Sequence, residues 1–315
     1  MQAGDIRNVS VIGAGFIGPG IAQIFASKNY NVHLSDIKGE LLPKAVESIR
    51  SNLSLMARKG VIPASEIEVV VGKIKTTTDM GEATSGAQLV IEAVTEDVGL
   101  KQKVFQELDR LCPPETILAT NTSVISITEI AAKAIRRERI VGTHFWNPPF
   151  LIPLVEVTKA RDTSDEVMEI TFEVLKSAGK HPVKCLKDVP GFIANRLQHA
   201  LFREAISIVE NGITDAATVD EAIKNSFAIR LPVLGPMETA DMVGLDLTLS
   251  IHDYILKYLE SSPQPSPLLK EKVEKGELGF KTGKGFQIWS AEEANKSRQR
   301  LLEYLIEWTK REQGK

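Results

Sequence analysis

The chain has 315 residues, of which 43% are hydrophobic and 25% are charged, and this predicts a globular protein of two domains. Its formal net charge is −3 and its pI is about 6.1, so its charge predicts binding neither to nucleic acid nor to a membrane surface. Its two cysteines and five histidines lack the spacing of a disulfide framework or a metal site. We find no apolar run of membrane-spanning length and no targeting segment, and therefore expect a soluble cytoplasmic protein.

Short apolar runs alternate with amphipathic segments in the first half of the chain. Strands are predicted at 9–14, 32–36, 89–94, 116–121, 140–145, 154–157 and 181–186, and helices at 21–29, 40–59, 101–111, 126–136 and 165–178. Strands that alternate with helices indicate βαβ units and a parallel sheet. The apolar runs are nearly continuous, which is typical of strands covered on both faces. The pattern predicts an α/β domain with a doubly wound sheet.

Helical periodicity dominates after about residue 190. A long amphipathic segment ends at Gly212, and further helices are predicted within 218–227 and 244–259, followed by a proline-rich loop at 261–267. The boundary is expected in the KDVPG turn. This divides the chain into an α/β domain of residues 1–188 and an all-α domain of residues 189–315.

A glycine-rich turn follows the first predicted strand. The segment GAGFIG comprises Gly13, Ala14, Gly15, Phe16, Ile17 and Gly18. It opens a helix, and Asp36 ends the next predicted strand, as in dinucleotide-binding turns. In such turns the glycines allow close approach of a pyrophosphate, and the helix N-terminus stabilises its charge. Asp36 would accept hydrogen bonds from ribose hydroxyls and repel a 2′-phosphate, which favours NAD over NADP. The alternative is a glycine-rich turn in some other doubly wound fold.

His144 and Glu156 flank a proline-containing turn in the stretch HFWNPPFLIPLVEV. Histidine titrates near neutral pH and therefore suits a general base for alcohol oxidation. A carboxylate that returns across the turn could orient the imidazole and stabilise its protonated form. Taken singly, His144 could be a core histidine and Glu156 an edge-strand carboxylate that faces water. Their position beside the predicted cofactor crevice favours a catalytic pair.

Six blocks of the sequence resemble one enzyme family. They are VIGAGFIG, LVIEAVTED, ETILATNTSVISITEIA, HFWNPPFLIPLVEV, VPGFIANR and LGFKTGKGF. In this order they are similar to the L-3-hydroxyacyl-CoA dehydrogenase family, which also includes L-gulonate 3-dehydrogenase (lambda-crystallin) and carnitine dehydrogenase. The resemblance covers nearly the whole chain. It implies a Rossmann-type domain that binds NAD, followed by a helical domain through which two subunits form a homodimer.

The resemblance also implies roles for individual residues. His144 would be the base and Glu156 its partner, while Ser123 and Asn195 would hold the substrate oxygens. The residues implied to contact the cofactor are Asn147 at the nicotinamide, and Glu96, Lys101 and Lys281. Without the resemblance, these would be a helix N-cap and a polar helix residue (Ser123 and Asn195), a turn residue (Asn147) and surface charges (Glu96, Lys101 and Lys281). The implied reaction is oxidation of a 3-hydroxyl group of an L-3-hydroxyacyl-CoA.

The sequence departs from the acyl-CoA pattern at three places. Ser54 matches a position near the CoA moiety, but Val61 stands where acyl-CoA members often carry lysine. The segment NPPFLIPLVEV is closer to the gulonate branch. Arg230, in FAIRLPVLGP, matches an arginine of the gulonate and carnitine enzymes. Arginine binds carboxylates through two parallel hydrogen bonds, so Arg230 could bind a free hydroxy acid, although it could equally be a surface residue at a helix end.

Two further classes of protein are less consistent with the sequence. A lens relative of this family is a bulk structural protein, so this chain could be a scaffold with vestigial chemistry. Its intact set of Ser123, His144, Glu156 and Asn195 argues against that class. A short-chain-type reductase would need a YxxxK pair, and no tyrosine of this chain has a lysine four residues later.

Overall fold

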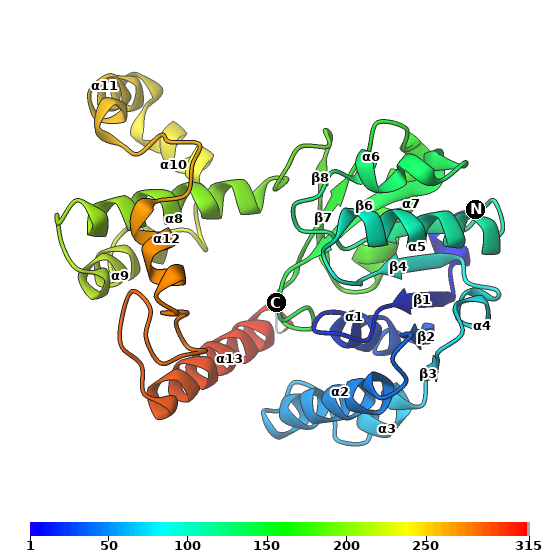
Figure 1. Ribbon diagram of the computed structural model, residues 1–315. Helices are drawn as coiled ribbons and strands as arrows, with labels where there is room; N and C mark the ends of the chain where they lie inside the picture. Colours follow the sequence, from blue (N-terminus) through cyan, green and yellow to red (C-terminus); the bar gives the residue numbers. More distant parts are fainter. Residues whose placement is uncertain (314–315) are drawn as a thin grey trace. The chain divides into compact units, whose positions relative to one another are not determined.

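The computed structural model describes residues 1–313 (Figure 1). Eight strands in these residues form one sheet in the order β3-β2-β1-β4-β5-β6-β7-β8. Their bounds are β1 Asn8–Ile12, β2 Asn31–Ser35, β3 Ile74–Thr77, β4 Leu89–Glu92, β5 Ile117–Thr120, β6 Ile140–Phe145, β7 Leu154–Thr158 and β8 His181–Cys185. Neighbouring strands are parallel except for β6 and β7, which are antiparallel. The predicted doubly wound α/β sheet is confirmed.

Helices cover both faces of this sheet. One core contains residues of α1 (Gly18–Ala26), α2 (Leu41–Arg58), α3 (Glu66–Val71) and α7 (Asp165–Ser177); the other contains residues of α4 (Met80–Thr84), α5 (Val98–Leu111) and α6 (Ile127–Ile130). In β4, Leu89 and Ile91 belong to the first core and Val90 belongs to the second. Successive strand residues point to opposite faces. The continuous apolar run of β4 is therefore explained by burial on both sides.

In two segments of the first half, the structure differs from the sequence prediction. The apolar pattern predicts nothing between residues 60 and 88, where α3, β3 and α4 lie. β3 is an edge strand whose two middle residues are exposed, so it lacks an apolar run. The helix predicted at 126–136 is shorter, because α6 ends at Ile130 and the chain continues as the 3-10 turn Ala131–Lys133.

The second half of the chain is helical, as predicted. Its helices are α8 Ala194–Glu210, α9 Ala216–Lys224, α10 Pro236–Val243, α11 Leu245–Ile255, α12 Pro267–Glu274 and α13 Ala291–Gln313. Gly212 adopts φ 67°, as expected of a glycine that ends a helix. None of the helices among residues 1–313 is long and apolar enough to cross a membrane.

The chain forms two compact units. The first contains Met1–Arg196 and the segment from Leu302 onward, and the second contains Leu197–Leu301. The first unit continues past the KDVPG turn to Arg196. One reason is that the backbone N–H groups of Ile193 and Ala194, at the start of α8, are bonded to Glu156 of β7.

A buried carboxylate joins α5 to the loop before β6. The Asp109 carboxylate accepts a hydrogen bond from Arg139 Nη2 at 2.8 Å and one from the backbone N–H of Ile135, also at 2.8 Å. Both Asp109 and Arg139 are almost fully buried. Burial would raise the pKa of Asp109, but the bonds from Arg139, Ile135 and Arg136 outweigh it and hold that pKa below the ordinary value of 3.8.

We expect Asp109→Asn to lower the free energy of unfolding of the first unit by roughly 3–5 kcal/mol, because it leaves the Arg139 charge buried without a counter-ion. The stability that Asp109 contributes is present above pH 3.8 and is lost as pH falls through its lower folded pKa. The variant should therefore lose less stability in acid than the wild type. Thermal unfolding between pH 3 and 7 measures both effects, since a domain of this size shifts its Tm by about 2–4 °C per kcal/mol.

The matched control is Glu107→Gln on the same helix, since Glu107 pairs with Arg110 on the exposed face. Exposed pairs of this kind contribute little to stability. Equal losses of stability in the two variants would contradict the assignment of Asp109 as a buried anchor.

Candidate active site

His144 and Glu156 face each other across the antiparallel pair β6 and β7. Their Cα atoms are direct partners in the strand register, and His144 Nδ1 lies 2.8 Å from Glu156 Oε2. Both side chains are buried, Glu156 completely. The turn between the strands thus returns the glutamate to the histidine, so the structure brings these two residues together.

The Glu156 carboxylate receives four hydrogen bonds. Oε2 accepts from His144 and from Trp146 Nε1 at 3.3 Å. Oε1 accepts from the backbone N–H groups of Ile193 and Ala194, each at 2.9 Å, where α8 begins. Burial alone would raise the pKa of Glu156, but these four bonds outweigh it and hold the pKa below its usual value. Glu156 is therefore ionised at neutral pH.

The ionised carboxylate decides the tautomer of His144. It can only accept hydrogen bonds, so in the neutral imidazole the proton is on Nδ1 and Nε2 is an acceptor. Nε2 forms no hydrogen bond with any residue in the described part of the chain. The rings of Trp146 and Phe192 lie 5.5 and 5.8 Å from the imidazole centre. The arrangement leaves one basic nitrogen available to remove a proton from a substrate.

Ser123 and Asn195 lie next to each other. Asn195 Nδ2 donates to the Ser123 carbonyl at 3.1 Å, and the Ser123 backbone N–H donates to Glu96 Oε1 at 2.9 Å. The Ser123 hydroxyl has no hydrogen-bond partner among residues 1–313. The serine is held through its backbone, which leaves its side chain free to meet a ligand.

Lys101 is enclosed rather than exposed at the start of its helix. Only 1% of its surface is exposed, and its ammonium group lies 2.7 Å from Glu92 Oε1 and 3.2 Å from Glu96 Oε2. Burial raises the pKa of Glu92 despite the bonds that it accepts from Lys101 and Thr120. Lys101 thus joins the end of β4 to Glu96, which in turn holds the backbone of Ser123.

The glycine-rich turn has the geometry of a phosphate cradle. Gly13 adopts φ 116°, and a Cβ atom on Gly18 would lie 1.8 Å from the Gly13 carbonyl oxygen, so the turn and α1 pack too closely for a side chain there. A Cβ atom on Gly15 would meet nothing within 4 Å. The backbone N–H groups of Gly15, Phe16 and Ile17 have no acceptor among the described residues. These open donors at the start of a helix fit a pyrophosphate.

Asp36 lies beside this turn at the end of β2. Its Oδ2 atom accepts a hydrogen bond from the backbone N–H of Ala14 at 2.8 Å. Ile37, the next residue, is 84% exposed, and Phe16 in the turn is 83% exposed. Exposed apolar side chains beside a polar cradle are typical of a surface that a flat ring covers. The sequence prediction named Phe16 and Asp36 but not Ile37.

The sequence prediction also missed Trp146, Phe192 and Glu92. Trp146 and Phe192 occur in the quoted blocks, but only their contacts with His144 and Glu156 distinguish them from other aromatic core residues. Asn147, which was predicted, is exposed in the turn after β6. Its side chain has no hydrogen-bond partner in the described residues.

Arg230 and Lys281 belong to the second compact unit. Arg230 follows the 3-10 turn Phe227–Ile229, and Lys281 lies in the turn after Phe280. Both side chains are exposed, and neither forms an ion pair within residues 1–313. They are therefore free to bind an anion, while the predicted catalytic residues all lie in the first unit.

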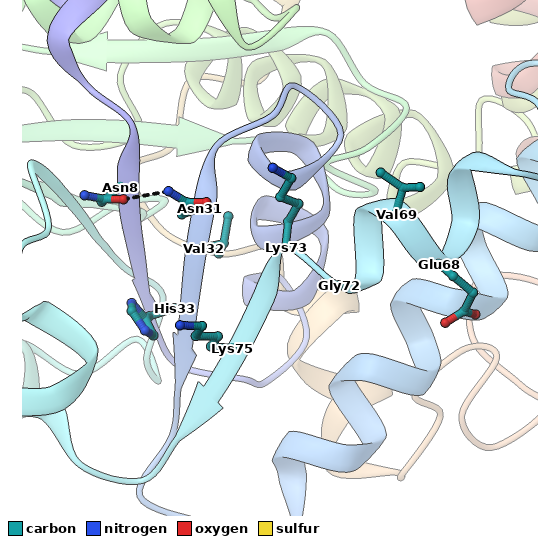
Figure 2. A pocket seen from close by; sticks show the side chains of 9 residues that line it. All are labelled: Asn8, Asn31, Val32, His33, Glu68, Val69, Gly72, Lys73 and Lys75. Carbon is teal, nitrogen blue, oxygen red and sulfur yellow. Dashed lines mark hydrogen bonds between the residues drawn. The ribbon is translucent and has the colours of Figure 1, made fainter.

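A hollow lies at the amino ends of the strands, away from the candidate site (Figure 2). Asn8, Asn31 and Lys73 lie at the amino ends of β1, β2 and β3, and the hollow has a volume of about 580 Å³. None of its titratable side chains is buried, since Glu68 and Lys75 are exposed and His33 and Lys73 are partly exposed. Ligands of doubly wound sheets bind at the carboxyl ends of the strands, where Asp36 and His144 lie.

The chain matches two domain descriptions of one family. The description "3-hydroxyacyl-CoA dehydrogenase, NAD binding domain" matches residues 8–189, and the C-terminal domain of the same family matches residues 191–289. A probable 3-hydroxybutyryl-CoA dehydrogenase of Bacillus subtilis is 38% identical over 283 residues, covering 90% of this chain and 97% of that protein. The 5-formyl-3-hydroxy-2-methylpyridine 4-carboxylate 5-dehydrogenase of Mesorhizobium japonicum is 36% identical over 291 residues, with 91% and 92% covered.

Solved structures show the same two relationships. A structure of the pyridine carboxylate dehydrogenase, described as an NAD+ dependent dismutase, has a TM-score of 0.89 and 33% identity, covering 96% of both chains. The (S)-3-hydroxybutyryl-CoA dehydrogenase of Ralstonia eutropha has a TM-score of 0.76 and 34% identity, covering 90% of this chain and 99% of that one. The predicted family and its cofactor NAD are confirmed.

We expect His144→Gln to lower kcat for NAD reduction by about 10²–10⁴, because glutamine cannot accept the substrate proton. NADH affinity, measured by fluorescence titration, should stay unchanged, since the phosphate cradle and Asp36 are intact. The control is His33→Gln, at a residue that lines the hollow at the amino ends of the strands (Figure 2). This variant should keep full activity. Wild-type turnover by His144→Gln would exclude His144 as the base.

Proposed function

Because the chain belongs to the 3-hydroxyacyl-CoA dehydrogenase family, we propose that it oxidises the 3-hydroxyl group of an L-3-hydroxyacyl-CoA with NAD, in a reversible reaction. The observation that carries this proposal is the buried His144–Glu156 pair, whose Nε2 atom is free of partners among the described residues. The pair lies at the carboxyl edge of the sheet, at the end of β6. That edge also carries the glycine-rich turn and Asp36.

The residues divide the chemistry among them. Nε2 of His144 takes the hydroxyl proton while Glu156 stabilises the imidazolium that forms. NAD, when bound, would supply the acceptor for the hydride that leaves the carbon bearing this hydroxyl group. The Ser123 hydroxyl and the Asn195 amide are the groups best placed to orient the substrate oxygens. Asp36 favours NAD over NADP, since its carboxylate repels a 2′-phosphate.

A free hydroxy acid is the second candidate substrate. Arg230 is exposed and without an ion-pair partner among the described residues, which suits binding of a free carboxylate. The similarity to a dehydrogenase of a pyridine carboxylate supports this candidate. Val61, in place of the lysine of many acyl-CoA members, supports it too. The reaction and the roles of His144 and Glu156 are the same for both candidates.

The test is to follow NADH formation with L-3-hydroxybutyryl-CoA, free 3-hydroxybutyrate, L-gulonate and L-carnitine. We expect the thioester to have the highest kcat/KM, and Arg230→Ala to leave that value unchanged. The control is Arg300→Ala, an exposed arginine of the same unit. If a free acid is preferred and Arg230→Ala raises its KM about tenfold or more, as loss of a charge-assisted bond of about 1.4 kcal/mol predicts, the free-acid candidate replaces the acyl-CoA one.

We also propose that the second unit pairs with a second copy of this chain. Large apolar side chains are exposed along α10 and α11. A monomeric protein rarely exposes so many of them in one region. The most exposed are Met237 at 73%, then Tyr254 in α11 and Tyr258 just after it at 71% each, then Leu245 at 63% and Leu249 at 62%. Homodimer interfaces are apolar in this way.

We expect light scattering after size-exclusion chromatography to give about twice the chain mass of 34.6 kDa, as a twofold pairing requires. Leu249→Glu should shift the protein to the monomer mass, because a charge at the centre of an apolar interface is costly to bury. Lys257→Glu, on an exposed polar position of the same segment, is the control. A wild-type monomer would contradict the proposal.

A further inference from the structure

Lys180 lies between α7 and β8, outside the set of residues that the reaction requires. Gly179, with φ 77°, ends α7, and the backbone N–H of Lys180 donates to the Leu175 carbonyl. The residue as a whole is half-buried.

The ammonium group of Lys180 binds backbone rather than a carboxylate. Nζ donates to the Pro149 carbonyl at 2.7 Å and to the Ile152 carbonyl at 2.5 Å. No acidic side chain pairs with it among residues 1–313. Burial lowers its pKa from 10.5 to about 8. Burial of a charged group without a counter-ion costs free energy. An ion pair therefore does not explain the position of Lys180.

Both carbonyls belong to the turn that joins β6 to β7. At one end of this turn, Trp146 donates to the Glu156 carboxylate at 3.3 Å. In its middle, Pro149 packs against α1, since a Cβ atom on Gly20 would lie 3.0 Å from its ring. The turn therefore lies between the catalytic pair and the helix of the phosphate cradle. A dinucleotide with its pyrophosphate at that helix and its nicotinamide at His144 would extend past this turn.

We propose that Lys180 is a positioning residue. Its hydrogen bonds to the Pro149 and Ile152 carbonyls fix this turn and thereby the nicotinamide end of the cofactor site. The inference rests on the proposed function, because it assumes that the cofactor extends past His144. Lys180 itself touches neither substrate nor cofactor. It acts through the turn, on Trp146 and on the exposed Asn147.

The titratable groups around Lys180 bear on how its hydrogen bonds to the turn depend on pH. A cavity of about 760 Å³ behind the turn is lined by Lys180 and by four other titratable groups, Lys28 of the α1–β2 loop, Glu66 of α3, His181 of β8 and Glu312 of α13. All four are exposed. Above about pH 8 Lys180 loses its charge, and its bonds to the carbonyls lose the strength that charge gives.

We do not expect loss of this charge to destabilise the fold. Since the folded pKa of Lys180 is lower than the ordinary one, the unfolded chain binds more protons between pH 8 and 10.5. The contribution of Lys180 to stability therefore rises with pH in this window. If cofactor affinity falls between pH 8 and 10.5 and the fall depends on Lys180, its cause is therefore a change in the turn and not unfolding.

The experiment compares Lys180→Met with wild type in binding NADH and ADP-ribose, which lacks the nicotinamide. We expect the NADH dissociation constant to rise about tenfold or more, in line with the cost of a small displacement in a site, while ADP-ribose affinity and thermal stability stay unchanged. Wild-type NADH affinity should fall as pH rises through 8, and the variant should lack this dependence. Lys28→Met, a lysine of the same cavity, should behave as wild type.

Equal changes in NADH and ADP-ribose affinity, or no change in either, would overturn the inference. If Lys180→Met does not fold, Gly20→Ala displaces Pro149 with Lys180 intact and should weaken NADH selectively; unchanged NADH affinity in that variant overturns the inference as well. The binding measurements need no substrate. A wild type that oxidises none of the hydroxy acids would therefore refute the proposed function and leave the test of Lys180 valid.

Discussion

The site depends on one buried negative charge, the Glu156 carboxylate. An ionised carboxylate taken out of water is costly unless its lone pairs are used. Four donors use them here, and they come from three places in the chain: His144 on the neighbouring strand, Trp146 in the turn, and two N–H groups at the start of α8. The same charge therefore orients the base, anchors the turn and begins the helix that carries Asn195.

A second carboxylate repeats this arrangement on the other side of the site. Glu96 Oε1 accepts bonds from Thr122 Oγ1 and from the backbone N–H groups of Ser123 and Val124, and Lys101 neutralises it from behind. Both carboxylates hold backbone next to a polar side chain that is proposed to orient the substrate, Ser123 for Glu96 and Asn195 for Glu156. The donors and acceptors of the site are thus fixed before a substrate arrives, which is the condition for electrostatic stabilisation of a transition state.

The features that could be predicted from the sequence are those that depend on residues close together in the chain. Continuous apolar runs marked the buried strands, and the proline-containing turn between His144 and Glu156 implied a return of the chain. β3 was missed because an edge strand with two exposed middle residues has no such run. Lys101 was interpreted as a possible surface charge because its burial depends on Glu92, which belongs to a different element of the fold. The predicted helix at 126–136 ends early for a related reason, since the segment after it is bound to Asp109 of α5.

The two compact units explain why the reaction class could be inferred more readily than the substrate. Ser123, His144, Glu156 and Asn195 all lie in the first unit, where the sheet fixes their mutual geometry through strand register and buried hydrogen bonds. Arg230, the residue proposed to bind the carboxylate of a free acid, lies in the second and makes no ion pair with the described residues. Catalytic geometry of this kind is constrained by the core that surrounds it, whereas an exposed arginine can change with little cost to folding. Substrate choice within one catalytic scaffold can therefore vary on the second unit while the first stays the same.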